Sequence, residues 1–386
     1  MENYRYFVPD YLKSFSCKMG ACRHACCNGW QVSISMENYF KLLGLDCSPD
    51  MRRRLDVGLR LLDRRSPEEY AFFNPRYDGD CPMRMADGRC QLHAEIGEEV
   101  LSDVCRLYPR GVRNEEEGLE CSLANSCEGV LELFLHKEEK MTFGEESFSF
   151  APPPFPGKSL QIGLEGKKRA LRLYFISILQ KRELPLSHRL LLLGGQLKKV
   201  ALAVKEKDGA AIDRLLSSPL PCAESFEKAE KEDLEWGLAI MERLVDGLDR
   251  HSVSIREAGQ EALSYFENGA SFESYEKAKR SFEEHLPSGE LFFEHVLVNH
   301  LFFSLFPFKD APDAFEEEYV ALCTIYALMR FLCLGCLARE YSEEKLIDLL
   351  AAAFRLIDHT DFERYASKIL KSSGCEKDEA HRLLLL

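Results

Sequence analysis

Residues 317 to 341 read EEYVALCTIYALMRFLCLGCLAREY, with apolar side chains at three- and four-residue spacing throughout. This is the period of an α-helix, in which residues three and four apart lie on one face. Four further stretches repeat the pattern: KKRALRLYFISILQKREL (167–184), SHRLLLLGGQLKKVALAVKEK (187–207), DLEWGLAIMERLVDGLDRH (233–251) and GELFFEHVLVNHLFFSLF (289–306). We therefore predict an all-α helical bundle over residues 160–386.

A proline-rich segment precedes the bundle. Residues 147–159 read SFSFAPPPFPGKS, and four prolines and a glycine neither continue a helix nor suit a central strand. We predict a linker there and a separate domain over residues 1–146. In that domain the patterns are shorter: MENYFKLLGL (36–45), MRRRLDVGLRLLD (51–63) and EIGEEVLSDVCRLY (95–108) indicate helices, and GLECSLAN (118–125) is compatible with a short strand.

The composition excludes several classes of protein. A formal charge of −14 over 386 residues argues against a nucleic-acid partner, because phosphate neutralisation needs a basic surface. The opening MENYRYFVPDYLKSF lacks the regions of a signal peptide, and no uncharged run reaches the ~18 to 20 residues that span a bilayer. We expect a cytoplasmic protein with no transmembrane segment.

Cysteine is concentrated ahead of the predicted linker. Ten of the fifteen cysteines precede Glu128: Cys17, Cys22, Cys26, Cys27, Cys47, Cys81, Cys90, Cys105, Cys121 and Cys127. Cytosolic thiols are kept reduced, so metal binding or redox chemistry is favoured over disulfides. Four thiolates complete a tetrahedral zinc site or hold one [4Fe–4S] cluster. The fold class is thus mainly α, with an irregular cysteine-rich metal-binding head joined to a helical bundle.

Spacing alone does not name the ligands. The adjacent pair Cys26 and Cys27 can turn to one metal only in irregular backbone, which Asn28-Gly29 would permit. Ten candidates exceed the needs of one site, so zinc or iron–sulfur, and one site or two, stay open. His24 could be a further ligand or a proton donor, but a position on a surface loop is favoured. Elsewhere the sequence favours core positions for Cys323, Cys333 and Cys336, favours core or surface positions over a metal pair for His295 and His300, and says nothing of the isolated Cys222 and Cys375.

Several motifs, in order, resemble the flagellin lysine-N-methylase family and a wider group of cysteine-rich zinc- or iron-chelating proteins. They are PDYLKSFSCKMGACRHACCNGWQVSIS (9–35), CPMRMADGRCQLH (81–93), LSDVCRLYPR (101–110) and LANSCEGVLELFL (123–135). LYFISILQKRELPLSHRLLLLG (173–194) and VLVNHLFFSLFPF (296–308) extend the resemblance into the helical part. The chain departs from the fuller pattern at Met83 and at Cys127-Glu128-Gly129.

The resemblance implies a methyltransferase that uses S-adenosylmethionine, contains an iron–sulfur cluster and methylates the lysine ε-amino groups of flagellin. It also implies a set of metal-binding cysteines, from which Cys121 is left out. By position they are Cys17, Cys22, Cys26, Cys27, Cys81, Cys90, Cys105 and Cys127. The alternatives are a non-enzymatic zinc or iron–sulfur protein with a helical docking domain, and a redox carrier.

Methylation by displacement requires a neutral amine, whereas free lysine has a pKa near ~10.4. Tyr108, Glu128 and His24 lie beside the cysteines in sequence and are candidate bases. The radical-type CxxxCxxC spacing is absent, which weakens a radical mechanism without excluding it. No glycine-rich turn between strand and helix is present to hold a nucleoside. We therefore expect S-adenosylmethionine to bind beside the metal, in residues 14–127.

The helical part is also expected to supply a groove for the protein substrate. Six phenylalanines crowd one short stretch, more than a single helix face normally buries: Phe292, Phe293, Phe302, Phe303, Phe306 and Phe308. Most belong to the core on this reading, and the remainder would line the groove.

Overall fold

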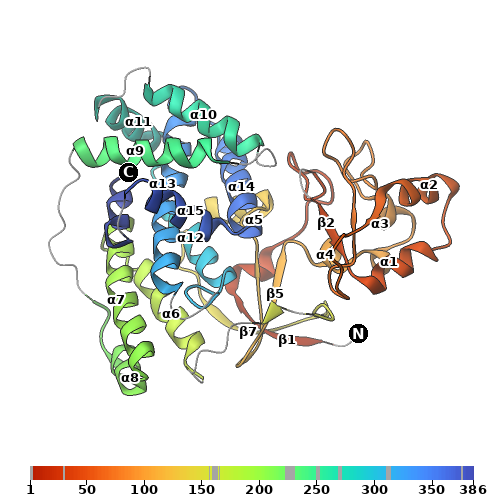
Figure 1. Ribbon diagram of the computed structural model, residues 1–386, viewed down its shortest axis with the longest axis horizontal. Helices are drawn as coiled ribbons and strands as arrows, with labels where there is room; N and C mark the ends of the chain where they lie inside the picture. Colours follow the sequence, from red (N-terminus) through yellow and green to blue (C-terminus); the bar gives the residue numbers. More distant parts are fainter. Residues whose placement is uncertain are drawn as a thin grey trace.

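The computed structural model describes residues 3–28, 31–155, 157–158, 164, 166–221, 231–248, 253–267, 272–309, 314–374 and 377–386. Cys222 and Cys375 lie outside these residues. Figure 1 shows a helical body with a β-sheet at its base and a smaller lobe beside it. The prediction of a mainly α chain is confirmed.

The body contains the predicted helical segments. Its helices are α5 (Glu128–Leu135), α6 (Lys168–Leu179), α7 (Leu186–Glu206), α8 (Gly209–Ser217), α9 (Lys231–Asp246), α10 (Val253–Glu267), α11 (Phe272–His285), α12 (Gly289–Phe303), α13 (Phe315–Leu337), α14 (Glu343–His359) and α15 (Phe362–Ser372). A 3₁₀ helix, η5 (Lys377–Leu385), closes the chain against α13. The five quoted stretches correspond to α6, α7, α9, α12 and α13, whereas α5, α8, α10, α11, α14 and α15 were not predicted.

Helix α13 is the centre of the body. It packs against α7, α9, α10, α11, α14, α15 and η5. Cys323, Cys333 and Cys336 are buried in it, which confirms them as core residues. By length and composition alone α13 could also cross a membrane, with a mean hydropathy of 2.0, which the sequence analysis did not anticipate; 94% of that window is buried within the fold.

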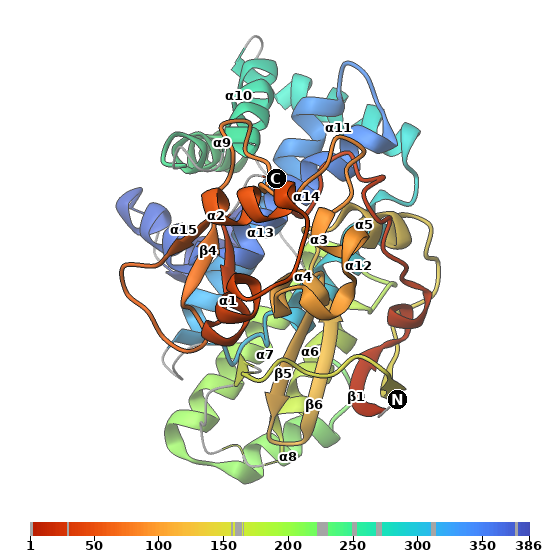
Figure 2. The same ribbon diagram turned by 90° about the vertical axis from the view of Figure 1, so that its right-hand side faces the viewer.

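A five-stranded sheet underlies the helices, in the order β7 (Phe143–Phe148), β1 (Tyr4–Pro9), β6 (Gly118–Leu123), β5 (Arg110–Glu115) and β8 (Gly157–Lys158). The short strand predicted at GLECSLAN is confirmed as β6. The β1–β6 and β5–β8 pairs are parallel, and the others are antiparallel. Figure 2 shows β1, β6 and β5 side by side. The other four strands were not predicted for the head, and β1, β7 and β8 pair with strands far along the chain.

A buried ion cluster fastens the sheet to the helices. Glu120 on β6 is 1% exposed and accepts hydrogen bonds from Arg169 Nε at 2.8 Å and Arg172 Nη1 at 2.6 Å. Charge-assisted hydrogen bonds of this kind satisfy a carboxylate that would be costly to bury alone. Nearby, β5 approaches α12 so closely that a Cβ on Gly111 would lie 2.5 Å from the ring of Phe303. Gly111 is thus required by this contact.

The small lobe has its own sheet and core. Strands β2 (Val32–Ile34), β4 (Ala71–Phe73) and β3 (Leu59–Leu61) pair antiparallel in that order. Around them lie α1 (Met36–Leu43), α2 (Pro49–Gly58), α3 (Gln91–Glu95), η2 (Glu98–Val100) and α4 (Asp103–Leu107). Met51, Leu55 and Phe73 are among its buried side chains.

Local signals explain where the lobe's helices begin and end. Ser35 and Ser48 cap α1 and α2 by accepting from the backbone N–H groups of Asn38 and Met51. The helix predicted over residues 51–63 ends at Gly58 because residues 59–61 pair with β4. The helix predicted over residues 95–108 is broken at Gly97, whose φ of 136° is a glycine conformation.

The two hydrophobic cores divide the chain differently from the predicted linker. Tyr6, Val8 and Cys121 of the sheet belong to the same core as the helices, whereas the second core contains residues of the lobe from Val32 to Val100. The lobe is therefore inserted between η1 (Asp10–Ser14), which follows β1, and β5. The boundary at residues 147–159 stays a prediction.

Candidate functional site

The cysteine-rich loop, residues 15–28, joins the body to the lobe. Its anchor is Glu128, the first residue of α5, whose side chain is 2% exposed. That carboxylate accepts from Lys18 Nζ at 2.9 Å and from the backbone N–H groups of Arg23 and His24 at 3.1 and 3.2 Å. Arg23 also pairs with Asp348 on α14 at 2.9 Å. The loop is thus fixed to the helical body.

Four of the predicted ligands form a first thiol set at the start of the lobe: Cys27, Cys81, Cys90 and Cys105. Two backbone contacts hold Cys27 and Cys81 together. One is an antiparallel bridge between Asn28 and Asp80, and the other is a hydrogen bond from Cys81 N to Cys27 O at 2.7 Å. The Cys105 thiol interacts electrostatically with the thiols of Cys90 and Cys27. The Cys81 thiol interacts in the same way with Cys27, Cys90 and Cys105.

Three others form a second thiol set on the side of the body: Cys17, Cys22 and Cys127. The Cys127 thiol neighbours both Cys22 and Cys17. Cys26 lies between the sets, hydrogen-bonded to Cys27 and near both Cys105 and Cys17. All eight cysteines named by the resemblance therefore fall in two adjoining groups, while Cys121 is buried in the sheet core.

The surroundings of the thiols hold most of them protonated. Burial raises the pKa of Cys127 to about 12, against the opposing backbone N–H groups of Val130 and Gly129. Cys105 is exposed as a residue, but its thiol faces inward, and this burial raises its pKa to about 12. A hydrogen bond from Cys26 lowers the pKa of Cys27 to about 7 and raises that of Cys26.

These donors fit a thiolate-bound metal or cluster in their chemistry. Metal binding requires deprotonated sulfur, and N–H groups aimed at the sulfurs stabilise thiolates. Such N–H groups reach Cys127 from Gly129 and Val130, and Cys90 from Leu92 and His93. Among the described residues, however, no three cysteine, histidine or acidic side chains converge closely enough to surround an ion. The ligand set stays a prediction.

A buried polar network leads from the second thiol set into the body. Tyr108 Oη lies 3.0 Å from Ser126 Oγ, which lies 2.9 Å from His359 Nε2 on α14. The preceding residue, Asn125, donates its backbone N–H to Asp358 Oδ2 at 3.1 Å. Residues directly before Cys127 are therefore bonded to the C-terminal end of α14.

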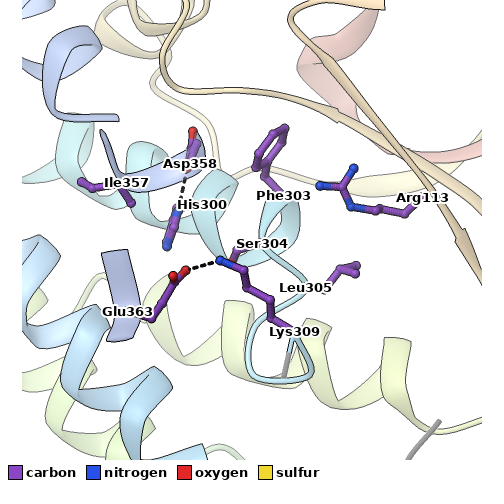
Figure 3. A pocket seen from close by; sticks show the side chains of 9 residues that line it. All are labelled: Arg113, His300, Phe303, Ser304, Leu305, Lys309, Ile357, Asp358 and Glu363. Carbon is purple, nitrogen blue, oxygen red and sulfur yellow. Dashed lines mark hydrogen bonds and ion pairs between the residues drawn. The ribbon is translucent and has the colours of Figure 1, made fainter. Parts of the chain in front are cut away.

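A cavity of about 140 Å³ lies at the far end of this network. Figure 3 shows its lining: Arg113, His300, Phe303, Ser304, Leu305, Lys309, Ile357, Asp358 and Glu363. A hydrogen bond and an ion pair cross it: His300 Nδ1 lies 3.1 Å from Asp358 Oδ1, and Lys309 Nζ lies 2.6 Å from Glu363 Oε1. Arg113 lies over the Phe303 ring at 5.6 Å. The cavity thus combines apolar walls with paired charges.

The candidate bases named from the sequence are engaged elsewhere. Burial raises the pKa of Tyr108 well above its ordinary value, Glu128 holds the loop, and the ring of His24 faces Asp348 at 3.4 Å rather than the thiols. The sequence analysis missed the His300–Asp358 pair. The two residues are 58 positions apart, and the only signal was that His300 falls within the motif VLVNHLFFSLFPF.

The predicted phenylalanine cluster is buried throughout. The six side chains are 1% to 9% exposed. Only Phe303 among them lines the described cavity. The prediction that most belong to the core is confirmed, and the groove for a protein substrate stays a prediction.

Comparison with known proteins gives the family. Flagellar biosynthetic protein FliU of Salmonella muenchen is 27% identical over 36% of this chain and 83% of its own length. The lysine-N-methylases of Salmonella typhimurium and Salmonella choleraesuis are each 26% identical over 40% of this chain and 40% of their own length. The chain thus matches less than half of those two relatives, and no solved structure matches it significantly.

Residues 172–384, more than half of the chain, match the family described as FliB lysine N-methylase C-terminal domain. This range begins in α6 and ends in η5, so it contains every body helix from α7 to α15 and eight of the nine residues that line the cavity, all except Arg113. The chain belongs to the FliB lysine N-methylase family, whose named activity is the N-methylation of lysine.

Proposed function

We propose that the protein transfers methyl groups from S-adenosylmethionine to lysine ε-amino groups of flagellin. Membership of the lysine N-methylase family carries the reaction, and the flagellar names of the relatives support the substrate. Methyl transfer to lysine breaks the carbon–sulfur bond of a sulfonium donor and forms a carbon–nitrogen bond. The protein must therefore present a neutral lysine to that donor.

The two thiol sets are the proposed cofactor site, with a [4Fe–4S] cluster as the expected group and zinc as the alternative. The first set offers four sulfurs, enough for one complete site. The second set offers three, and Cys26 lies within reach of either. An iron without a thiolate can take the amino and carboxylate groups of methionine, so a cluster would supply a seat for the donor there. Reduced thiols also suit the cytoplasm, where we expect the protein.

Three observations support a cofactor at this place. The eight cysteines gather where the loop, the lobe and α5 meet; backbone N–H groups face several sulfurs; and the loop is tied to the body by Glu128. A ligand that spans the two sets would hold the lobe and the body in a fixed relation, since the first set is mainly in the lobe and Cys127 is the N-cap residue of α5.

The test begins with protein purified without oxygen. We expect a brown protein with iron and sulfide, and transfer of labelled methyl from S-adenosylmethionine to lysines of purified flagellin. Colourless protein with one equivalent of zinc would show that the metal is zinc and not a cluster. If no methyl is transferred and the protein gives a reversible electron-transfer wave, the protein is a redox carrier and not a methyltransferase.

Cysteine variants test the site itself. Cys26→Ser and Cys105→Ser should lower metal content and solubility together, because metal–ligand bonds formed only in the folded state add to folding free energy. Cys47→Ser is the matched control, since Cys47 belongs to the lobe but to neither thiol set. Equal metal content in all three variants would refute the assignment.

A further inference from the structure

The cavity between β5, α12, α14 and α15 contains a histidine whose tautomer is set by its surroundings. His300 and Asp358 are almost fully buried, with side chains 5% and 1% exposed. A carboxylate only accepts hydrogen bonds, so the proton between the two lies on His300 Nδ1. In the neutral form of this imidazole, Nε2 carries a free lone pair. Asp358 itself is held by the backbone N–H of Asn125 at 3.1 Å.

The free end of the ring is directed into the cavity. In Figure 3, His300 points away from Asp358 toward the pair formed by Lys309 and Glu363. Phe354 packs on the ring with centroids 5.7 Å apart, which restricts its rotation. An unprotonated imidazole nitrogen, fixed by a carboxylate behind it and facing an open volume, has the arrangement of a general base.

The remaining lining suits a long aliphatic side chain that ends in an amine. Phe303, Leu305 and Ile357 supply apolar walls, and about 140 Å³ is close to the volume of one such chain. The hydroxyl of Ser304 is buried there with no hydrogen-bond partner among the described residues. Leu305 adopts φ +62°, a conformation that costs a leucine energy and is found where a site requires it.

The charges that face His300 nearly cancel. Asp358 and Glu363 are negative, and Lys309 and Arg113 are positive. Glu363 pairs with Lys309, and Asp358 accepts hydrogen bonds from His300 Nδ1 and from the backbone N–H of Asn125. An ammonium that enters finds no free carboxylate, and it loses its water. Desolvation can lower the pKa of a lysine to about 5 or 6 in fully buried sites, so proton transfer to an imidazole becomes feasible.

We propose that this cavity receives the substrate lysine and that His300 is the general base that removes its proton, with Asp358 as the positioning residue. The proposal rests on the proposed methylation of lysine. His300 Nε2 takes one proton from the ε-ammonium and becomes imidazolium beside Asp358. The freed nitrogen lone pair forms the bond to the methyl carbon of the sulfonium donor, which must therefore reach the cavity from the second thiol set along the segment Asn125–Cys127 that is bonded to Asp358. The carbon–sulfur pair stays on sulfur, which becomes a neutral thioether, and the imidazolium releases its proton to solvent on the side of Lys309, whose side chain is 35% exposed.

The test is the pH dependence of methyl transfer by the full, metal-loaded chain with flagellin as substrate. At pH 7, His300→Gln should be slower by about 10²- to 10⁴-fold, the usual contribution of a general base. Without a base the rate follows the neutral fraction of lysine, which grows tenfold per pH unit below ~10.4. The deficit of the variant should therefore shrink steadily between pH 7 and pH 10.

Further variants separate a base from a structural histidine. His300→Ala should regain activity with added imidazole, and Asp358→Asn should lose activity at pH 7 because its amide can donate to Nδ1 and disturb the tautomer. His285→Gln, at an exposed histidine of the same body, is the matched control and should behave as the wild type. Metal content and thermal midpoint establish that each variant is folded.

The outcomes are distinguishable. No transfer by the wild-type protein at any pH would refute the proposed function. If the wild type is active, two results would refute His300 as the base while methylation stands. The first is a His300→Gln variant that keeps its rate at pH 7. The second is a folded His300→Gln variant whose deficit is constant at every pH, together with no rescue of His300→Ala by imidazole.

Discussion

Removal of the Glu128 carboxylate should release the cysteine-rich loop while the rest of the fold persists. Glu128 is 2% exposed and accepts three hydrogen bonds from that loop, at 2.9, 3.1 and 3.2 Å. In Glu128→Ala two of the donors, the N–H groups of Arg23 and His24, lose their acceptor. A hydrogen bond to a charged group contributes about 1.5–3 kcal/mol, and the loop gains hydration when it opens. We expect a cost of about 3 kcal/mol.

Two further variants grade the effect. Glu128→Gln keeps an acceptor oxygen for the N–H groups but loses the charge, so we expect about 1–1.5 kcal/mol. Glu132→Ala is the matched control, because Glu132 pairs with the same Lys18 at 2.6 Å but is 33% exposed. Exposed pairs of this kind contribute less than about 1 kcal/mol.

Amide hydrogen exchange of a peptide covering residues 15–28 measures these costs locally. Each 1.4 kcal/mol corresponds to a tenfold change in an equilibrium constant. Exchange should accelerate on the order of 100-fold in Glu128→Ala, about tenfold in Glu128→Gln and less than about fivefold in Glu132→Ala. Metal loss to a chelator should follow the same order, because partners of the ligands influence metal affinity by about 10- to 100-fold. Wild-type exchange in Glu128→Ala would show that the carboxylate does not hold the loop.

Two more perturbations follow from the body. Gly111→Ala places a methyl group 2.5 Å from the Phe303 ring, so the ring should turn into the cavity. We expect the free energy of unfolding to fall by about 1 kcal/mol and the KM for flagellin to rise. An unchanged KM would contradict the contact. Burial lowers the pKa of His295 from 6.5 to about 4, so the unfolded chain binds the extra proton first and stability is lost as pH falls from 6.5 to 4. At 1.36 kcal/mol per unit the loss is about 3 kcal/mol by pH 4, and urea unfolding of His295→Gln should show a flatter dependence over that window.

The sequence predicted those elements whose signal is local. Periodic apolar residues located α12 and α13, and the helix N-caps at Ser35 and Ser48 are of a kind that sequence shows. Apart from β6, the main sheet was not predicted, because β1 pairs with β7 through contacts such as Tyr4 with Phe148. The six residues of β1 have too little periodic pattern of their own to identify a strand whose partner lies far along the chain.

The site divides in the same way. The resemblance named eight cysteines, but the separation into two sets depends on how the lobe folds back on the loop at Cys27 and Cys81. The pair of His300 and Asp358 joins α12 to α14, and neither residue is unusual in its own segment. Sequence spacing cannot reveal a hydrogen bond made by tertiary packing.

The pairing of β1 with β7 also has a consequence for biosynthesis. Strand β1 leaves the ribosome before the other strands of its sheet, and its antiparallel partner begins only at Phe143. At a synthesis rate of about 5–20 residues per second, the strand waits roughly 7–30 s with an open edge. The lobe, whose core ends at Val100, can meanwhile complete itself on the nascent chain. Chaperone capture of the first nine residues during translation, and sensitivity of the yield to translation speed, are therefore expected of this architecture.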